Sequence, residues 1–232
     1  MERELIRRRD LPHWDVPGAA YFVTSCLEGS LPARGLLEIA RRRADLRDRP
    51  KPENLTAGEW DIYRWKLGFV CLERWLDGEP ANRALERPDL ARVVEGSMVH
   101  FAGERYDLLA YVVMPSHFHW VFQPRGEWTA ESKEEGPTAR ETIMYGLKRF
   151  AANCCNRLLG RCGTFWQAES YDRWIRDGDE LERIIRYVEE NPVEAGLVSE
   201  AAQWRFSSAW ARKQSGTEWG VPLPKISSGS ES

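Results

Sequence analysis

Two histidines separated by a single residue are the side chains with the clearest capacity for chemistry. In "AYVVMPSHFHWVFQP" (residues 110–124), His117 and His119 follow a strand-like apolar run and a turn signal. Side chains two apart on a strand point to the same face, so both imidazoles could hold one metal ion while Phe118 points into the core. A pair of structural histidines has the same spacing. The spacing alone therefore leaves both interpretations open.

A second candidate segment, "RYVEENPVEAG" (186–196), combines a tyrosine with an amide. Tyr187 and Asn191 are four residues apart and are therefore neighbours on a helix surface. A tyrosine beside an amide ligand can place its phenolic oxygen next to a metal-bound phosphate. The alternative makes Tyr187 a half-buried core residue and Asn191 a C-terminal cap before Pro192. These residues by themselves leave that choice open as well.

The elements that must position these residues follow from the periodicity of the chain. Runs rich in β-branched and aromatic residues predict strands at 19–27, 106–115 and 117–124, and a strand that breaks into a loop at 165–177. Apolar residues at helical spacing predict helices at 35–48, 89–106, 138–161 and 179–196, and the last should end or bend near Pro192. Residues 49–66 read as irregular and polar, and residues 65–78 as an apolar patch.

The order of these elements predicts the fold class. Strand, helix, two adjacent strands, helix, strand and helix is the split βαβ order of ferredoxin-like domains. We therefore expect an α+β fold with a central antiparallel sheet, helices on one face, and a helical insertion at about 33–88 after the first strand. A single domain would span 1–215. The segment 216–232, which ends in "SSGSES", would be a flexible C-terminal tail.

The composition narrows the function classes. Hydrophobic residues make up 42% and charged residues 30% of the 232 residues, as in ordinary globular proteins. The net charge of −3 argues against a uniformly basic nucleic-acid binder but allows a local basic face. Five cysteines without a CxxC pair predict neither a disulfide framework nor a zinc framework. Without a membrane-length apolar run or a signal-peptide pattern, we expect a cytoplasmic protein that does not contact membranes.

Three blocks, taken together, resemble a known family. They are "YVVMPSHFHWVF", "LKRFAANCCNRLLGRCGTFWQAESYDRWIRD" and "YVEENPVEAGLV…WRFSSAW". In this order and spacing they resemble the REP-associated tyrosine transposases, single-tyrosine HUH transposase-like proteins related to small insertion-sequence transposases. The resemblance extends from about Ala19 to Trp210 and makes residues 1–215 a single HUH transposase-like domain. Ser116 departs from the asparagine often found before the first histidine, which removes no ligand.

The resemblance implies a role for each site residue. His117 and His119 would be metal ligands, Asn191 would complete the metal site, and Tyr187 would be the catalytic nucleophile. The cofactor would be a divalent metal, Mg²⁺ or Mn²⁺, although two imidazoles and one amide do not exclude zinc or nickel.

The implied function is that of a metal-dependent single-stranded DNA transesterase. Such an enzyme cleaves and rejoins DNA at hairpin or palindromic repeats through a covalent 5′-phosphotyrosine. Two alternatives stay open. One is a non-cleaving protein, derived from a transposase, that binds DNA or RNA hairpins, and the other is a phosphodiesterase that uses water.

Basic residues near these elements are candidates for DNA contacts, since phosphate contacts need only charge. The candidates are Lys148, Arg149, Arg173, Arg176, Arg183 and Arg186. Solvated surface charge is the alternative for each of them. The expected partner is single-stranded DNA with hairpin structure, bound by a monomer or a homodimer.

Overall fold

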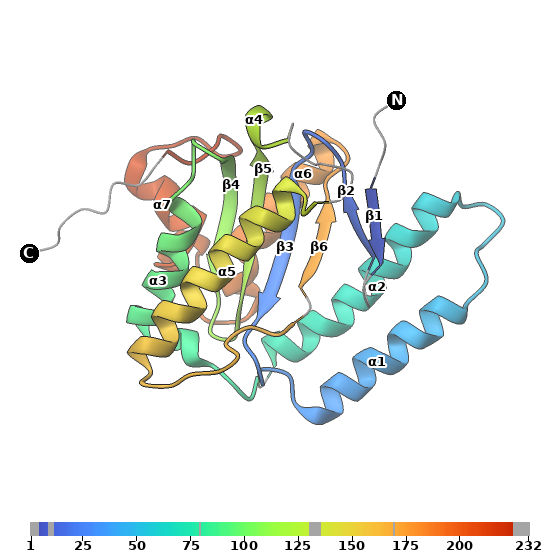
Figure 1. Ribbon diagram of the computed structural model, residues 1–232, viewed down its shortest axis with the longest axis horizontal. Coiled ribbons are helices and arrows are strands. Elements are labelled where there is room, and N and C mark those ends of the chain that lie inside the picture. Colours follow the sequence, from blue (N-terminus) through green and yellow to red (C-terminus); the bar gives the residue numbers. More distant parts are fainter. Residues whose placement is uncertain (1–4, 9–11, 79, 130–135, 169, 225–232) are drawn as a thin grey trace, which may run out of the picture.

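A four-stranded antiparallel sheet forms the centre of the protein (Figure 1). The structure is a computed structural model that describes residues 5–8, 12–78, 80–129, 136–168 and 170–224. The strands lie in the order β4-β5-β3-β6, with bounds β3 Tyr21–Cys26, β4 Tyr106–Val113, β5 His117–Pro124 and β6 Tyr171–Trp174. β3 pairs with both β5 and β6, and β4 pairs with β5. This arrangement confirms the predicted α+β fold with a split βαβ sheet.

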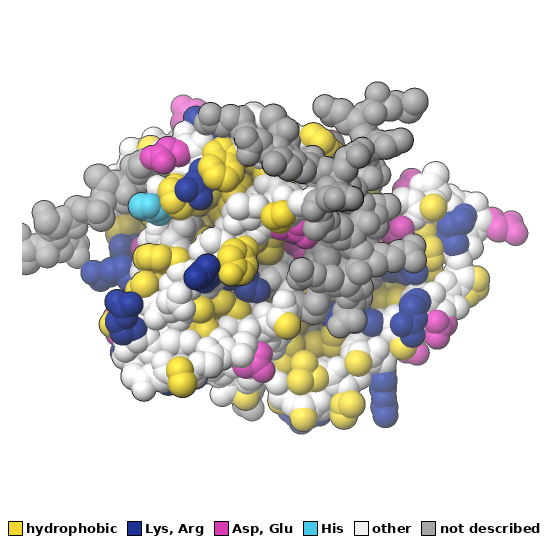
Figure 2. Space-filling model, viewed as in Figure 1, with side chains coloured by type: hydrophobic (Ala, Val, Ile, Leu, Met, Phe, Trp, Pro, Cys, Tyr) yellow, Lys and Arg dark blue, Asp and Glu magenta, His cyan; other side chains and the backbone are white. Residues whose placement is uncertain are grey.

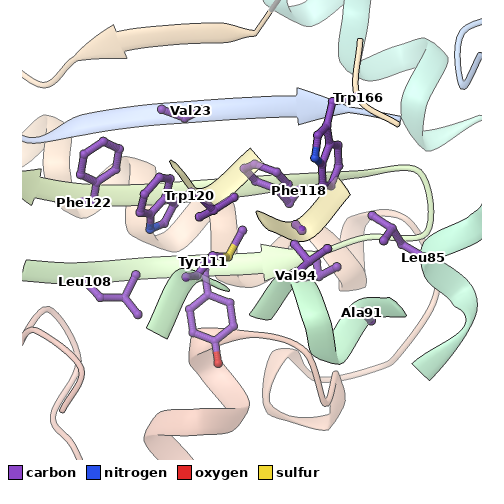
Figure 3. Close-up of a cluster of buried hydrophobic side chains, with 14 of the residues drawn as sticks. Val23, Leu85, Ala91, Val94, Leu108, Tyr111, Phe118, Trp120, Phe122 and Trp166 are labelled. Carbon is purple, nitrogen blue, oxygen red and sulfur yellow. The ribbon is translucent and has the colours of Figure 1, made fainter. Parts of the chain in front are cut away.

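Helices α3 (Pro88–Val99) and α5 (Ala139–Leu158) cover one face of the sheet (Figure 1). Alternate residues of β5, namely Phe118, Trp120 and Phe122, point into this layer (Figure 3). The rings of Trp120 and Phe122 stack with their centroids 4.0 Å apart. Burying each large side chain contributes about 1.5–3 kcal/mol, so this layer accounts for much of the stability of the fold. It also fixes which face of β5 the intervening histidines occupy.

Helices α2 (Ala57–Asp77) and α6 (Gly178–Glu194) pack on the opposite face of the sheet. The prediction that the helices cover one face of the sheet is therefore correct for α3 and α5, and wrong for α2 and α6. Every residue of β3 is buried, so the strand has an apolar surface on both sides and both must be covered. Phe22 and Val121 meet Phe69 of α2 and Val188 of α6 in this second layer.

The predicted helical insertion consists mainly of α1 (Ala33–Asp48) and α2, which lie side by side (Figure 1). The expectation that residues 49–66 are irregular is wrong from Ala57 onward. A capping box starts α2, in which the Thr56 side chain accepts from the Glu59 N–H and the Glu59 carboxylate accepts from the Thr56 N–H. The threonine and the glutamate three residues later are a recognisable helix-start signal.

The remaining elements are short or lie near the chain ends. β1 (Leu5–Arg8) and β2 (Pro12–Asp15) form a separate two-stranded sheet that was not predicted, because their charged residues and proline are unfavourable for strands. The others are η1 (Ala84–Glu86), α4 (Gly126–Thr129), η2 (Ala201–Gln203) and α7 (Ser208–Ser215). Among the described residues, no helix has the length and apolarity that crossing a membrane requires.

The predicted C-terminal tail begins with an ordered segment. Residues 225–232 lie outside the described residues. Upstream of them, Leu223 is buried in the core, and its N–H donates to the Leu108 carbonyl at 2.8 Å. The boundary expected at residue 216 is therefore too early.

Candidate metal and nucleophile site

His117 and His119 point to the face of β5 opposite its aromatic layer, and both are buried. Their Nε2 atoms lie 3.2 Å apart. The Nδ1 atom of His119 is 2.7 Å from Thr24 Oγ1 on β3, and the Nδ1 atom of His117 is 3.0 Å from Ser116 Oγ. Where each hydroxyl accepts the Nδ1 proton, both Nε2 lone pairs face the same space. A cation between them would satisfy both.

Burial, together with the neighbouring His119, lowers the pKa of His117 to about 3. The His117 imidazole is therefore neutral at ordinary pH, which is the form that binds metal ions.

Tyr187 and Asn191 project from α6 toward the histidines of the same chain. The Tyr187 hydroxyl lies 3.4 Å from His119 Nε2, and the Asn191 Nδ2 donates to Tyr187 Oη at 3.4 Å. The Tyr187 ring also contacts Phe22 and Phe69 edge-on. Tyr187 is thus both packed in the second layer and part of the polar cluster, so the two interpretations of this residue are compatible. Pro192 lies in the last turn of α6, which ends at Glu194 as predicted.

A fifth residue of this cluster, Glu73 on α2, was missed in the sequence. Its carboxylate accepts from the Tyr187 hydroxyl and lies 3.5 Å from His119 Nε2. One ligand atom each from Glu73, His117 and His119 lie within 4.8 Å of one another. The signal that could have revealed Glu73 is its position on an apolar helical stripe. Phe69, Leu72, Glu73 and Leu76 follow the i, i+3, i+4, i+7 spacing of a buried helix face.

The acidity of the cluster follows from burial and from neighbouring charges. Burial raises the pKa of Glu73, but His119, His117 and the Tyr187 hydrogen bond outweigh it and bring the pKa below its ordinary value. Burial and the negative charge of Glu73 raise the pKa of Tyr187 well above its ordinary value. Burial and Glu73 also raise the pKa of Asp77 to about 6. The Tyr187 phenol therefore stays protonated and needs an acceptor when it reacts.

Two buried oxygens test whether these residues fit a divalent ion. Glu73 Oε1 and Asn191 Oδ1 have no hydrogen-bond partner among the described residues. A buried polar atom without a partner costs about 1–3 kcal/mol, and both atoms are of the type that Mg²⁺ and Mn²⁺ prefer. Two ligands at about 2.1 Å from an ion and at right angles lie about 3 Å apart, which matches the 3.2 Å between the Nε2 atoms. The residues present therefore fit a divalent metal.

Comparisons with known proteins bear on the predicted resemblance. No family model matches the chain. The REP-associated tyrosine transposase of Escherichia coli (strain K12) is 25% identical over 104 residues, which are 44% of this chain and 54% of that relative. The chain thus spans about half the length of this curated relative. A solved structure described as "Structure of the REP associates tyrosine transposase bound to a REP hairpin" is similar with a TM-score of 0.52 and 15% identity, covering 99% of this chain and 96% of that one.

The chain resembles the REP-associated tyrosine transposases. The predicted resemblance is confirmed, in sequence over part of the chain and in fold over nearly all of it. At 15% identity, the structural likeness to a REP-associated tyrosine transposase concerns the fold.

Of the six basic residues that were predicted from their charge to contact DNA, Arg173 and Arg176 form ion pairs with Glu180. Arg173 is buried, pairs with Glu180 and lies over the Trp65 ring at 5.0 Å. Burial lowers the pKa of Arg173 to about 10, and its guanidinium is not presented to DNA. Arg176 is exposed and lies 3.3 Å from the same carboxylate. Both arginines hold the start of α6 against β6.

The other four basic residues lie on two different faces. Arg183 and Arg186 are exposed on α6 and line an open depression of about 450 Å³ beside Tyr187, together with Asp179, Glu182, Glu190 and Glu194. Lys148 and Arg149 belong to α5, across the sheet from Tyr187, where Lys148 donates to Ser170 at 2.9 Å. Figure 2 shows that α5 face, with basic side chains interspersed among apolar and acidic ones. Of the six basic residues, Arg183 and Arg186 are therefore the exposed pair that lies beside Tyr187.

Proposed function

We propose that the protein is a metal-dependent transesterase of single-stranded DNA that cleaves and rejoins strands at hairpin repeats through Tyr187. The observation that carries this proposal is that the Tyr187 hydroxyl lies beside the pair of histidines. The Tyr187 hydroxyl lies 3.4 Å from His119 Nε2, which in turn lies 3.2 Å from His117 Nε2. A nucleophile held at a divalent-metal site is what phosphoryl transfer to a side chain requires.

The covalent step is a substitution at phosphorus. Tyr187 Oη forms a bond to the phosphorus and passes its proton to the Glu73 carboxylate that accepts its hydrogen bond, while the bond from phosphorus to the 3′-oxygen breaks. The 3′-oxygen gains a proton and leaves as a 3′-hydroxyl, and the 5′-phosphate stays on Tyr187. Attack by another 3′-hydroxyl reverses these changes and rejoins a strand without an external energy source. When bound, Mg²⁺ or Mn²⁺ supplies charge neutralisation at the phosphate.

The residues of the chain supply position and a dry environment. His117, His119 and Asn191 would hold the ion, and all three are nearly fully buried. Phe22 and Phe69 flank the Tyr187 ring and limit its orientations. Orientation of this kind can supply several kcal/mol of the barrier reduction, about 7–11 kcal/mol in the best model reactions. Arg183 and Arg186 stand beside Tyr187, where they would contact phosphates of the bound strand.

Hairpin DNA is the substrate class that the comparisons support. The similar solved structure is described as bound to a REP hairpin, and the curated relative is named a REP-associated tyrosine transposase. The present chain would bind a hairpin with the strand to be cut placed over α6.

The proposal is tested by trapping the covalent intermediate. Incubation of the wild-type protein with a labelled hairpin oligonucleotide and Mn²⁺ should give a denaturation-resistant protein–DNA adduct. Tyr187→Phe removes the nucleophilic oxygen and should abolish the adduct while hairpin binding is kept. Tyr145→Phe, an exposed tyrosine on α5, is the matched control and should leave the adduct unchanged.

Any other outcome of this experiment would reject either the transesterase activity or Tyr187 as its nucleophile. An undiminished adduct in Tyr187→Phe would reject Tyr187 as the nucleophile. Cleavage by wild-type and Tyr187→Phe proteins without any adduct would indicate a phosphodiesterase that uses water. Chelator-insensitive hairpin binding with neither cleavage nor adduct would identify a binding protein.

A further inference from the structure

We infer that Glu73, on the inserted helix α2, is a further ligand of the metal ion and couples that ion to the nucleophile. This inference rests on the proposed function, because it adds a ligand to the ion on which that function depends. It makes the α1–α2 insertion a part of the metal site.

The two carboxylate oxygens of Glu73 have different surroundings. Oε2 accepts the hydroxyl of Tyr187 and lies 3.5 Å from His119 Nε2. Oε1 is buried and has no hydrogen-bond partner among the described residues. One oxygen of the Glu73 carboxylate can therefore bind the ion while the other oxygen accepts the Tyr187 hydroxyl.

Charge gives a second reason. Within the described part of the chain, the ion-pair partner of Glu73 is the imidazole of His119, and no lysine or arginine is paired with it. A buried carboxylate is costly unless a cation or several donors satisfy it. Two imidazoles and an amide carry no negative charge, so Glu73 would also supply the anionic oxygen that Mg²⁺ and Mn²⁺ favour.

The packing of the insertion keeps Glu73 in place. Phe69, one turn earlier on α2, packs with its ring centroid 5.4 Å from that of Phe22 on β3. Arg43 of α1 donates to the Tyr171 hydroxyl of β6, which ties the other inserted helix to the sheet. Both inserted helices are thus anchored to the sheet, α2 through Phe69 and α1 through Arg43.

The test measures metal binding without DNA. Isothermal titration of the chelator-treated full chain with Mn²⁺ is compared for wild type, Glu73→Gln and Glu38→Gln. The amide introduced by Glu73→Gln cannot supply an anionic oxygen, so Mn²⁺ binding should weaken by more than the roughly 10–100-fold that loss of a supporting hydrogen bond costs. Glu38→Gln removes an exposed carboxylate of the same insertion, which pairs with Arg74, and should bind Mn²⁺ as wild type does.

Two further measurements keep the result decisive. Glu73→Asp is the second variant, used in case Glu73→Gln fails to fold. It keeps the negative charge but draws the carboxylate back by one methylene, so it should bind Mn²⁺ more weakly than wild type. Binding of Zn²⁺, which imidazoles suit, should fall less in Glu73→Gln than binding of Mn²⁺.

The outcomes separate this inference from the proposed function. Mn²⁺ affinities within about twofold for wild type, Glu73→Gln and Glu73→Asp would overturn Glu73 as a ligand, even with a normal Tyr187 adduct. Absence of the adduct in wild type would overturn the transesterase while the titration still decided the role of Glu73.

Discussion

At the scale of single residues, the orientation of each histidine depends on a hydroxyl behind it. The Nδ1 atom of His119 is 2.7 Å from Thr24 Oγ1, across the β3–β5 pairing that sets Thr24 directly opposite His119. Such a contact fixes both the tautomer and the rotation of the ring. Ser116 Oγ lies 3.0 Å from His117 Nδ1, so the residue that departs from the expected asparagine still contacts the His117 ring.

Thr24→Val keeps the shape of the side chain but removes this hydroxyl. We expect Mn²⁺ affinity to fall about 10–100-fold, because the His119 ring loses its orienting partner. Titration calorimetry on the DNA-free protein measures the change. Ser25→Ala is the control, since its hydroxyl has no hydrogen-bond partner among the described residues and it is next in sequence. Equal affinities for Thr24→Val and wild type would show that the hydroxyl does not orient the ligand.

At the scale of elements, α6 is held in place from the side away from Tyr187 and the histidines. Glu189 on α6 accepts from Ser208 Oγ at 2.7 Å and from Arg212 Nε at 3.0 Å, and all three residues are buried. Arg212 also donates to the Leu109 carbonyl of β4 and the Val221 carbonyl. One guanidinium therefore joins α6, α7, β4 and the C-terminal segment, and it indirectly sets where Tyr187 lies.

Arg212→Ala should destabilise the fold by about 3–5 kcal/mol, because it leaves the buried Glu189 carboxylate without its cation. Urea denaturation measures the free energy of unfolding. Arg87→Ala is the control, as it breaks an exposed ion pair with Asp89 that solvent screens, and it should leave the free energy of unfolding nearly unchanged. A loss of only about 1 kcal/mol in Arg212→Ala would mean that the buried pair does not hold α6.

At the scale of the whole molecule, the sheet separates two surfaces with different basic residues. The proposed metal site lies on the side of α2 and α6, as do Arg183 and Arg186, whereas Lys148 and Arg149 lie on α5 across the sheet. A strand that reaches Tyr187 must run along the first surface. The acidic residues that share it, including Glu190 and Glu194, limit how many phosphates can bind there.

Arg183→Ala combined with Arg186→Ala should weaken hairpin binding and reduce its salt dependence. Loss of two phosphate contacts lowers the slope of log affinity against log salt by about 1.4–1.8. Fluorescence anisotropy over a range of salt concentrations measures this slope. Arg105→Ala with Arg125→Ala removes the same charge at the far end of β5 from His117 and should leave the slope unchanged. An unchanged slope in the α6 double variant would place the strand elsewhere.

The sequence by itself determined the order of the strands of the central sheet and of helices α3, α5 and α6, and the local geometry of each candidate pair. Alternation on β5 puts His117 and His119 on one face, and helical spacing puts Tyr187 and Asn191 on one side of α6. These are short-range properties, since backbone periodicity decides them within a few residues. The tertiary structure alone decided that α2 and α6 share a face of the sheet, that Arg173 is buried, and that Glu73 reaches Tyr187 from 114 residues away. Contacts at that separation depend on how apolar faces pack. The local sequence around Glu73 does not reveal that Tyr187 is its partner, and the sequence around Tyr187 does not reveal Glu73.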